Sequence, residues 1–254
     1  MIQLIFILMW GSTIPVYQDY PLKNGNPTSK GIAQYIEDKR DSLIIEYQNY
    51  MNDTLYDVWI YTDDLSDYIG NDSMELGWYY MNEVYITTSE LFLAYELADL
   101  SKVQKALINE SNRFVKSTVI HELTHKYMQQ IGIEMRSLDK IRVNQSYQSN
   151  IRILISQESF GRSFIEEGIC EYVSEMMGEI IPPRRPFIPK TVEDLMDKSN
   201  SYNVKYKYSS HVLKPFLDAR EFKKAVKILL HNPPPSYMEI LNPDLYFDRL
   251  VYED

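Results

Sequence analysis

Residues 121–125 read His121-Glu122-Leu123-Thr124-His125, and both the fold and the chemistry of the chain are best approached from this stretch. On a helix, positions four apart lie one turn apart and within about 40° of each other. Two imidazoles at that spacing can converge on one metal ion, while a glutamate offset by one residue can reach a water molecule beside the ion. The stretch therefore predicts one Zn²⁺ ion, with His121 and His125 as ligands and Glu122 as general base.

The residues around this motif predict a helix that is buried on one side. Val119 and Leu123 fall on the side away from the two histidines, so one face can pack while the other faces a cleft. We expect the helix to begin near Asn112 and to run to about Gln130, with Gly132 placed to end it.

A catalytic zinc ion needs a third protein ligand and an open fourth position. No histidine occurs between His125 and His211, so the third ligand is expected to be a carboxylate on a later helix. The stretch from Phe164 to Tyr172, Phe-Ile-Glu-Glu-Gly-Ile-Cys-Glu-Tyr, resembles the Trp-Leu-x-Glu-Gly-x-x-x-Tyr segment of the gluzincin family of zinc peptidases. This resemblance implies that Glu167 is the third zinc ligand.

The residues next to Glu167 have separate expected roles. Glu166 is the competing ligand, although it falls nearer the apolar flank of the helix. By the same resemblance, Gly168 lets the helix that carries Glu167 closely approach the helix that carries His121 and His125, called here the metal helix. Glu171, one turn further on, either orients a metal-bound imidazole or is solvated. Cys170 is expected to be a packing residue and not a ligand.

Hydrophobic periodicity predicts a small sheet followed by helices. Residues 55–62 alternate as in a strand, and residues 77–88 form two β-rich runs around a turn at 81–83, which is typical of a hairpin. We therefore expect an α+β fold, zincin-like by the resemblance, with a small antiparallel N-terminal sheet and a mainly helical C-terminal part. Further helices are predicted over residues 31–50, 90–108, 162–177, 205–217 and 219–230, with Thr191 as the cap of a short helix.

The first ten residues are nearly all apolar, but this run is too short to cross a bilayer, so no stable membrane span is expected. It resembles the apolar core of a secretion signal, which favours a secreted or cell-envelope protein; a buried first strand would instead fit a cytoplasmic one. We expect residues 1–30 to be this segment and a linker. Residues 31–254 should form one catalytic domain, with the sheet and metal helix in 31–130 and a helical subdomain in 131–254.

The charge of the chain excludes one class of partner. The formal net charge is −10, and the largest basic cluster is Arg184-Arg185. Since phosphate backbones are bound by a basic stripe, nucleic acid is not an expected partner. The acidic residues between Asp53 and Asp72 lack the alternation and central glycine of a calcium loop. With a single cysteine, no intrachain disulfide can form.

A second resemblance lies near the C-terminal end. Residues 232–246, Asn-Pro-Pro-Pro-Ser-Tyr-Met-Glu-Ile-Leu-Asn-Pro-Asp-Leu-Tyr, resemble the ending of poorly characterised bacterial and archaeal zincin-like peptidases. In those proteins a tyrosine-containing helix start precedes the ending, as residues 206–211 do here. From this helix Tyr208, Tyr206 or His211 is expected to donate a hydrogen bond to the oxyanion of the reaction.

Together these patterns predict a zinc metallopeptidase that hydrolyses peptide or protein substrates with a metal-activated water and Glu122 as general base. The Gly-x-Met-Glu-Asn segment with which aminopeptidases of the family hold a substrate amino terminus is absent, so an endopeptidase is expected. The substrate should add as a strand along residues 84–88. Two alternatives are a catalytically inactive zincin-fold binding protein and a secreted interaction protein whose motif is accidental.

Overall fold

The structure is a computed structural model. It describes residues 22–23, 26–27, 29–63, 77–80, 82–87, 113–138, 151–177, 186–197, 199–200 and 203–250. The apolar run at residues 1–10 and the helix expected over 90–108 lie outside these ranges.

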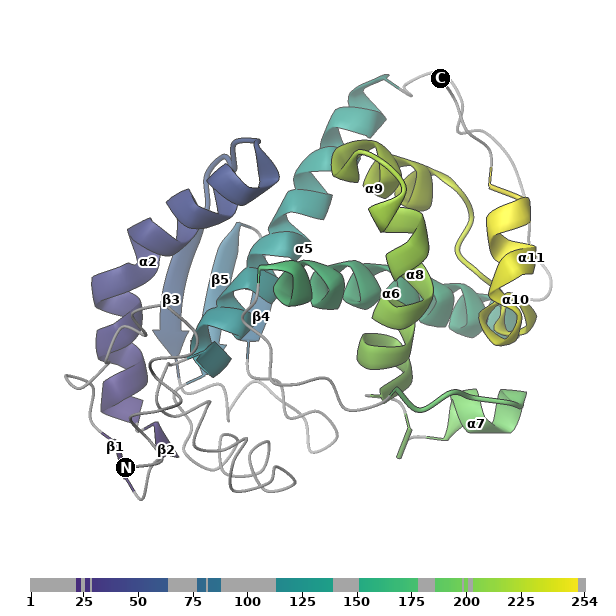
Figure 1. Ribbon diagram of the computed structural model, residues 1–254, viewed down its shortest axis with the longest axis horizontal. Coiled ribbons are helices and arrows are strands. Elements are labelled where there is room, and N and C mark those ends of the chain that lie inside the picture. The colour runs from purple at the N-terminus through teal and green to yellow at the C-terminus, as the bar shows by residue number, and fades with distance from the viewer. Residues whose placement is uncertain are drawn as a thin grey trace, which may run out of the picture.

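A three-stranded sheet forms one end of the molecule (Figure 1). Its strands are β3 (Trp59–Asp63), β4 (Gly77–Tyr80) and β5 (Glu83–Thr87), in the order β3-β5-β4. The expected hairpin is confirmed: β4 and β5 are antiparallel, and Asn82 in their turn has a φ of 82°, a left-handed conformation that asparagine tolerates. Strand β3 runs parallel to β5, with Trp59 opposite Glu83. A shorter antiparallel pair joins β1 (Leu22–Lys23) and β2 (Asn26–Pro27).

The expected fold class, α+β with a small antiparallel sheet, is wrong. The main sheet is mixed, and the part of the chain that the structure describes is predominantly helical. Alternation in residues 55–62 identified a strand correctly, but local pattern does not say which neighbour a strand pairs with or in which direction. A parallel neighbour requires a long crossover, and here the connection from β3 to β5 includes the whole of β4.

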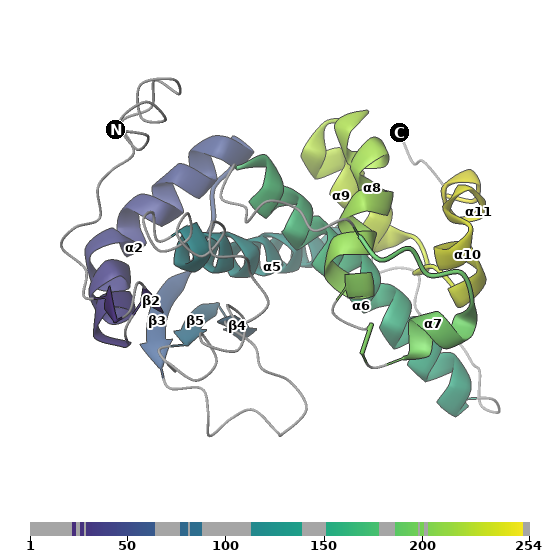
Figure 2. The same ribbon diagram turned by 60° about the horizontal axis from the view of Figure 1, so that its bottom comes forward.

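Two long helices cover one face of the sheet (Figures 1 and 2). Helix α2 (Ser29–Met51) packs against β3, and α5 (Arg113–Leu138) packs against β4 and β5. The sheet residues on this face are buried, as Ile60, Val84 and Ile86 show, whereas Trp59 on the opposite face is exposed. Each buried aliphatic side chain of this kind contributes about 1.5–3 kcal/mol to stability. The core that lies under residues 121–125 is therefore formed by the sheet together with α2 and α5.

Helix α6 (Ile151–Met176) crosses α5, and the remaining helices gather around α6 on the side away from the sheet (Figures 1 and 2). They are α7 (Val192–Met196), the π-helical turn η2 (Asn203–Tyr208), α8 (Ser209–Asp218), α9 (Phe222–His231), α10 (Tyr237–Leu241) and α11 (Pro243–Asp248). The prediction for Thr191 is confirmed, since it caps α7 in a reciprocal capping box with Asp194. Ser236 and Glu239 form the same arrangement at α10.

Two helix boundaries differ from those expected. Gly132 does not end α5, which continues to Leu138, and α6 begins at Ile151, well before residue 162. A glycine inside a helix costs only about 1 kcal/mol relative to alanine, which flanking helix-forming residues can offset. Residues 133–138 and 151–161, which lie outside the expected helices, are therefore helical. None of the helices in the described ranges combines the length and apolar character that a membrane crossing requires.

Candidate metal centre

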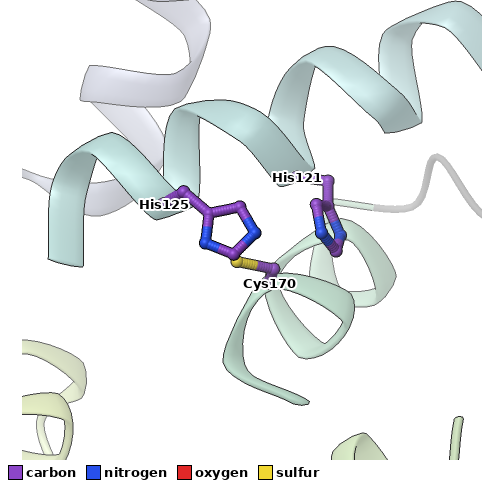
Figure 3. Close-up of side chains that lie close together, drawn as sticks. All are labelled: His121, His125 and Cys170. Carbon is purple, nitrogen blue, oxygen red and sulfur yellow. The ribbon is translucent and has the colours of Figure 1, made fainter. Parts of the chain in front are cut away.

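The two motif histidines lie on adjacent turns of α5 and face α6. Their ring centroids are 5.1 Å apart, with the planes at 69°, and both side chains are partly buried. Figure 3 shows both rings and the side chain of Cys170 pointing into the same space between the two helices. The helical spacing of the motif thus produces the convergence expected from the sequence.

Glu167 of α6 reaches both histidines. Its Oε2 atom lies 3.0 Å from His121 Nε2 and 3.5 Å from His125 Nε2. Burial alone would raise the pKa of Glu167, but the hydrogen bonds and charges of the two histidines outweigh it and hold that pKa well below its usual range. For His125 burial acts to lower the pKa, and Cys170 and Glu167 together raise it well above its usual value.

These distances fit a common metal ion. Two donors, each about 2.1 Å from one tetrahedral zinc ion, lie about 3.4 Å from each other. The observed separations of 3.0 and 3.5 Å bracket that value. Two imidazoles and a carboxylate are also the donor types that zinc takes in catalytic sites. The separations of Glu167 from the two histidines are therefore compatible with a shared zinc ion, while the donor atoms that all lie within 4.8 Å of one another belong to His121, His125 and Cys170.

Contacts on the far side of α5 hold the histidine-bearing turns in place. Tyr47 of α2 donates a hydrogen bond of 3.1 Å to the hydroxyl oxygen of Thr124, which lies between His121 and His125 in the sequence. Tyr47 and Thr124 are both fully buried. Lys126 donates to Asn82 Oδ1 at 2.7 Å, which fastens the β4–β5 turn to the helix. The next residue, Tyr127, donates to Asp53 Oδ2 at 3.1 Å.

Asp53 extends this support to the C-terminal helices. Its carboxylate also accepts a hydrogen bond of 2.7 Å from Lys223 of α9. Burial raises the pKa of Asp53, but the bonds from Lys223, Thr54 and Tyr127 lower it by more. A single carboxylate therefore links the end of α2, the metal helix α5 and α9.

Glu122 is buried at the start of β4. Its side chain is only 6% exposed, and a Cβ atom on Gly77 would lie 2.8 Å from its Cγ and 2.9 Å from its Oε1. The absence of a side chain at Gly77 thus allows the edge of the sheet to lie directly against this carboxylate.

The structure corrects the expected role of Gly168. A Cβ there would lie 2.8 Å from Ser209 Oγ and from Leu213 Cδ1, both on α8. The glycine does permit a close helix approach, but to α8 and not to the metal helix, because it lies on another side of α6 from Glu167.

Neither alternative expected for Glu171 holds. It is buried and forms an ion pair with Lys207 of η2, so it is not solvated, and its charge partner is a lysine. Glu166, the competing ligand, is partly buried; burial raises its pKa, against the lowering effect of His125 and Arg162. The atoms that contact both imidazoles belong to Glu167.

Cys170 is the site residue whose position the sequence did not predict. It is fully buried, and one donor atom each from His121, His125 and Cys170 lie within 4.8 Å of one another. Burial raises the pKa of its thiol to about 12, although His125 acts in the opposite direction. The available signal was its spacing: Glu167 and Cys170 are three residues apart on α6 and so share one face of the helix.

The three candidates for the oxyanion donor lie in or just after η2, and their side chains have different neighbours. Tyr206 lies against the site, with its ring centroid 5.7 Å from that of His121 and the planes tilted by 30°. The structure places the side chains of the other two candidates, Tyr208 and His211, elsewhere. The Tyr208 hydroxyl donates to the carbonyl of Ile240 at 3.1 Å in the core, and His211 is exposed on α8 near Glu175. Single π turns often occur at functional sites, and this one presents consecutive residues to different neighbours.

The predicted substrate strand is also corrected. Residues 84–88 overlap β5, which is the central strand and already pairs with β3 and β4 on its two sides. Among the described strands, β4 is the edge strand nearer the metal helix.

Comparisons of the chain with protein-family models, with curated proteins and with solved structures found no match.

Proposed function

We propose that the protein is a zinc-dependent peptidase in which His121, His125 and Glu167 hold the metal. The observation that carries this proposal is the position of Glu167 Oε2, 3.0 and 3.5 Å from the Nε2 atoms of the two histidines. When bound there, a zinc ion supplies a Lewis acid that acidifies a water molecule and polarises a carbonyl group. The remaining steps belong to the side chains of the chain itself.

Glu122 is the proposed general base. It follows His121 directly and is buried where α5 meets β4. Its charge acts on Cys170 by raising the pKa of the thiol, although Glu122 is not in the group of donor atoms within 4.8 Å of one another. Glu122 takes a proton from the attacking water and returns it to the leaving amine of the substrate. Tyr206 is the proposed donor to the oxyanion, supported by its ring contact with His121.

The proposed substrate is an extended peptide that pairs with β4. Within the described residues, β4 pairs with β5 alone, and its first residue, Gly77, lies against Glu122. Backbone pairing along this strand would carry a peptide past the general base while reading few of its side chains. An endopeptidase with broad sequence tolerance is the expected activity.

The test combines metal content with hydrolysis of a mixed peptide library. We expect about one zinc ion per chain, cleavage by the wild type, and loss of cleavage in Glu122→Gln with zinc retained. Glu167→Gln should lose zinc, whereas Glu166→Gln serves as the matched control that keeps it. Full activity in Glu122→Gln would overturn the mechanism. Stoichiometric zinc without any cleavage by the wild type would favour the inactive binding protein instead.

A further inference from the structure

We infer that Cys170 is a fourth protein donor of this metal centre, so that the resting ion is held by two imidazoles, a carboxylate and a thiolate. This inference rests on the proposed function only in requiring a metal ion at the site. It adds a ligand that the family resemblance does not supply, and it changes what the resting centre can do.

The first argument is distance. A zinc ion with nitrogen at about 2.1 Å and sulfur at about 2.3 Å places those two donors about 3.6 Å apart in a tetrahedral shell. The donor atoms of Cys170, His121 and His125 already lie within 4.8 Å of one another. Against target spacings of about 3.4 Å between two nitrogens and about 3.6 Å between nitrogen and sulfur, these three donors need to approach by at most about 1.4 Å, which rotation of a side chain can supply. Figure 3 shows the sulfur beside the His125 ring.

The second argument is the face of α6 on which Cys170 lies. Residues 167, 170 and 174 follow a spacing of three and four, which forms one stripe along a helix. Both ends of this stripe contact α5, because Glu167 bonds to the histidines and Ser174 Oγ donates to the carbonyl of Ser117 at 3.4 Å. Cys170, between them, therefore faces α5 as well. The apolar residues Ile169 and Val173 are buried beside this stripe.

The third argument is chemical. Zinc binds thiolate readily, and binding releases the thiol proton to solvent. Four protein donors complete a tetrahedral shell, which is the arrangement of a closed site, whereas catalysis needs an open position. With all four donors bound, the site would have the ligand set of a closed centre, and Cys170 is the donor whose release would open a position for a substrate carbonyl. Removing the sulfur leaves that position open.

Cobalt(II) substitution provides the test, because the chain has a single cysteine. Any thiolate-to-cobalt charge-transfer absorption in the near ultraviolet must then arise from Cys170. We expect this band in cobalt-loaded wild type, its loss in Cys170→Ser, and its retention in Ser174→Ala, a matched buried position one turn along α6. Zinc affinity should fall about tenfold or more in Cys170→Ser, since even an outer-shell partner contributes that much.

The outcomes separate this inference from the proposed function. Cobalt bound without the thiolate band in the wild type overturns the inference and leaves the peptidase proposal intact. A thiolate band with no peptide cleavage by the wild type or by Cys170→Ser supports the inference and overturns the peptidase. Failure of the wild type to bind cobalt or zinc overturns both. If Cys170→Ser does not fold, the wild-type spectrum still decides.

Discussion

Replacing Gly77 by alanine should disturb the metal helix through the side chain of Glu122. A Cβ at this position would lie 2.7 Å from Thr118 Cγ2, 2.8 Å from Glu122 Cγ and 2.9 Å from Glu122 Oε1. Favourable contacts between such atoms begin at about 3.5 Å. Either the carboxylate or strand β4 must therefore withdraw by roughly 0.7 Å, the difference between these distances.

The expected magnitude follows from this overlap. Overpacking by a methyl group costs about 1–3 kcal/mol, and for a chain of this length each kcal/mol lowers Tm by about 2–4 °C. A loss of roughly 2–12 °C is therefore expected. A shift of about 1 Å in a reacting group costs about 100-fold in rate. A shift of roughly 0.7 Å should thus lower kcat by about 10- to 100-fold, equivalent to about 1.4–2.7 kcal/mol in the barrier.

Thermal unfolding of the zinc-loaded protein and hydrolysis of a peptide selected from the library provide the two measurements. Gly132→Ala is the matched control, because it makes the same change inside α5 where no atom beyond the adjacent residues and the local helix backbone lies within 4 Å of the added methyl group. That variant should be neutral or more stable by about 0.5–1 kcal/mol. Zinc content should remain at the wild-type value in both variants.

A compensating background tests the cause. If the added methyl group collides with Glu122 and Thr118, then Gly77→Ala should cost much less stability in a chain that already carries Glu122→Ala and Thr118→Ser. An unchanged Tm and kcat for Gly77→Ala in the wild-type background would refute the reasoning. An undiminished loss in the compensating background would show that the strain lies elsewhere.

Two further predictions concern the tyrosines of η2 and the acid stability of the C-terminal helices. Tyr206→Phe should lower kcat by about 100-fold with zinc retained, whereas Tyr208→Phe should keep kcat and lose about 1 kcal/mol of stability; similar kcat values in the two variants would contradict the assignment. Burial acts to raise the pKa of Glu239, but Arg249 and the backbone and hydroxyl of Ser236 hold it at about 2, well below the usual pKa of a glutamate. Its stabilising effect is therefore complete above about pH 4.5 and lost as the pH falls towards 2. Acid titration of unfolding should show this slope in the wild type and not in Glu239→Gln.

The relative placement of the motif side chains was predictable because it depends on one helix. Five residues fix the relative directions of His121, Glu122 and His125 whatever the rest of the chain does. Glu167 could be expected near the two histidines once a second helix was assumed to pack against the first. The resemblance to gluzincins indicated which face of that second helix does so.

Features that depend on how elements pair were not predictable. Gly168 indicates that another helix lies close to α6, but the sequence does not say which one. In the structure it is α8. Strand β5 is central because β3 returns beside it in parallel, which no local pattern encodes. Tyr206 and Tyr208 are equivalent by composition, and only the π-helical turn assigns one to His121 and the other to Ile240.

The carboxylate of Asp53 also imposes an order on the folding of the chain. Its partner Lys223 lies 170 residues further along, and Tyr127 lies 74 residues further along. During synthesis the N-terminal part emerges first, so α2 and the sheet are made long before the lysine that completes this ionic link. Contacts of such large sequence separation slow folding, because the intervening chain must be closed into a loop before they form. The geometry of the metal helix is therefore expected to be reached late, after α9 has docked.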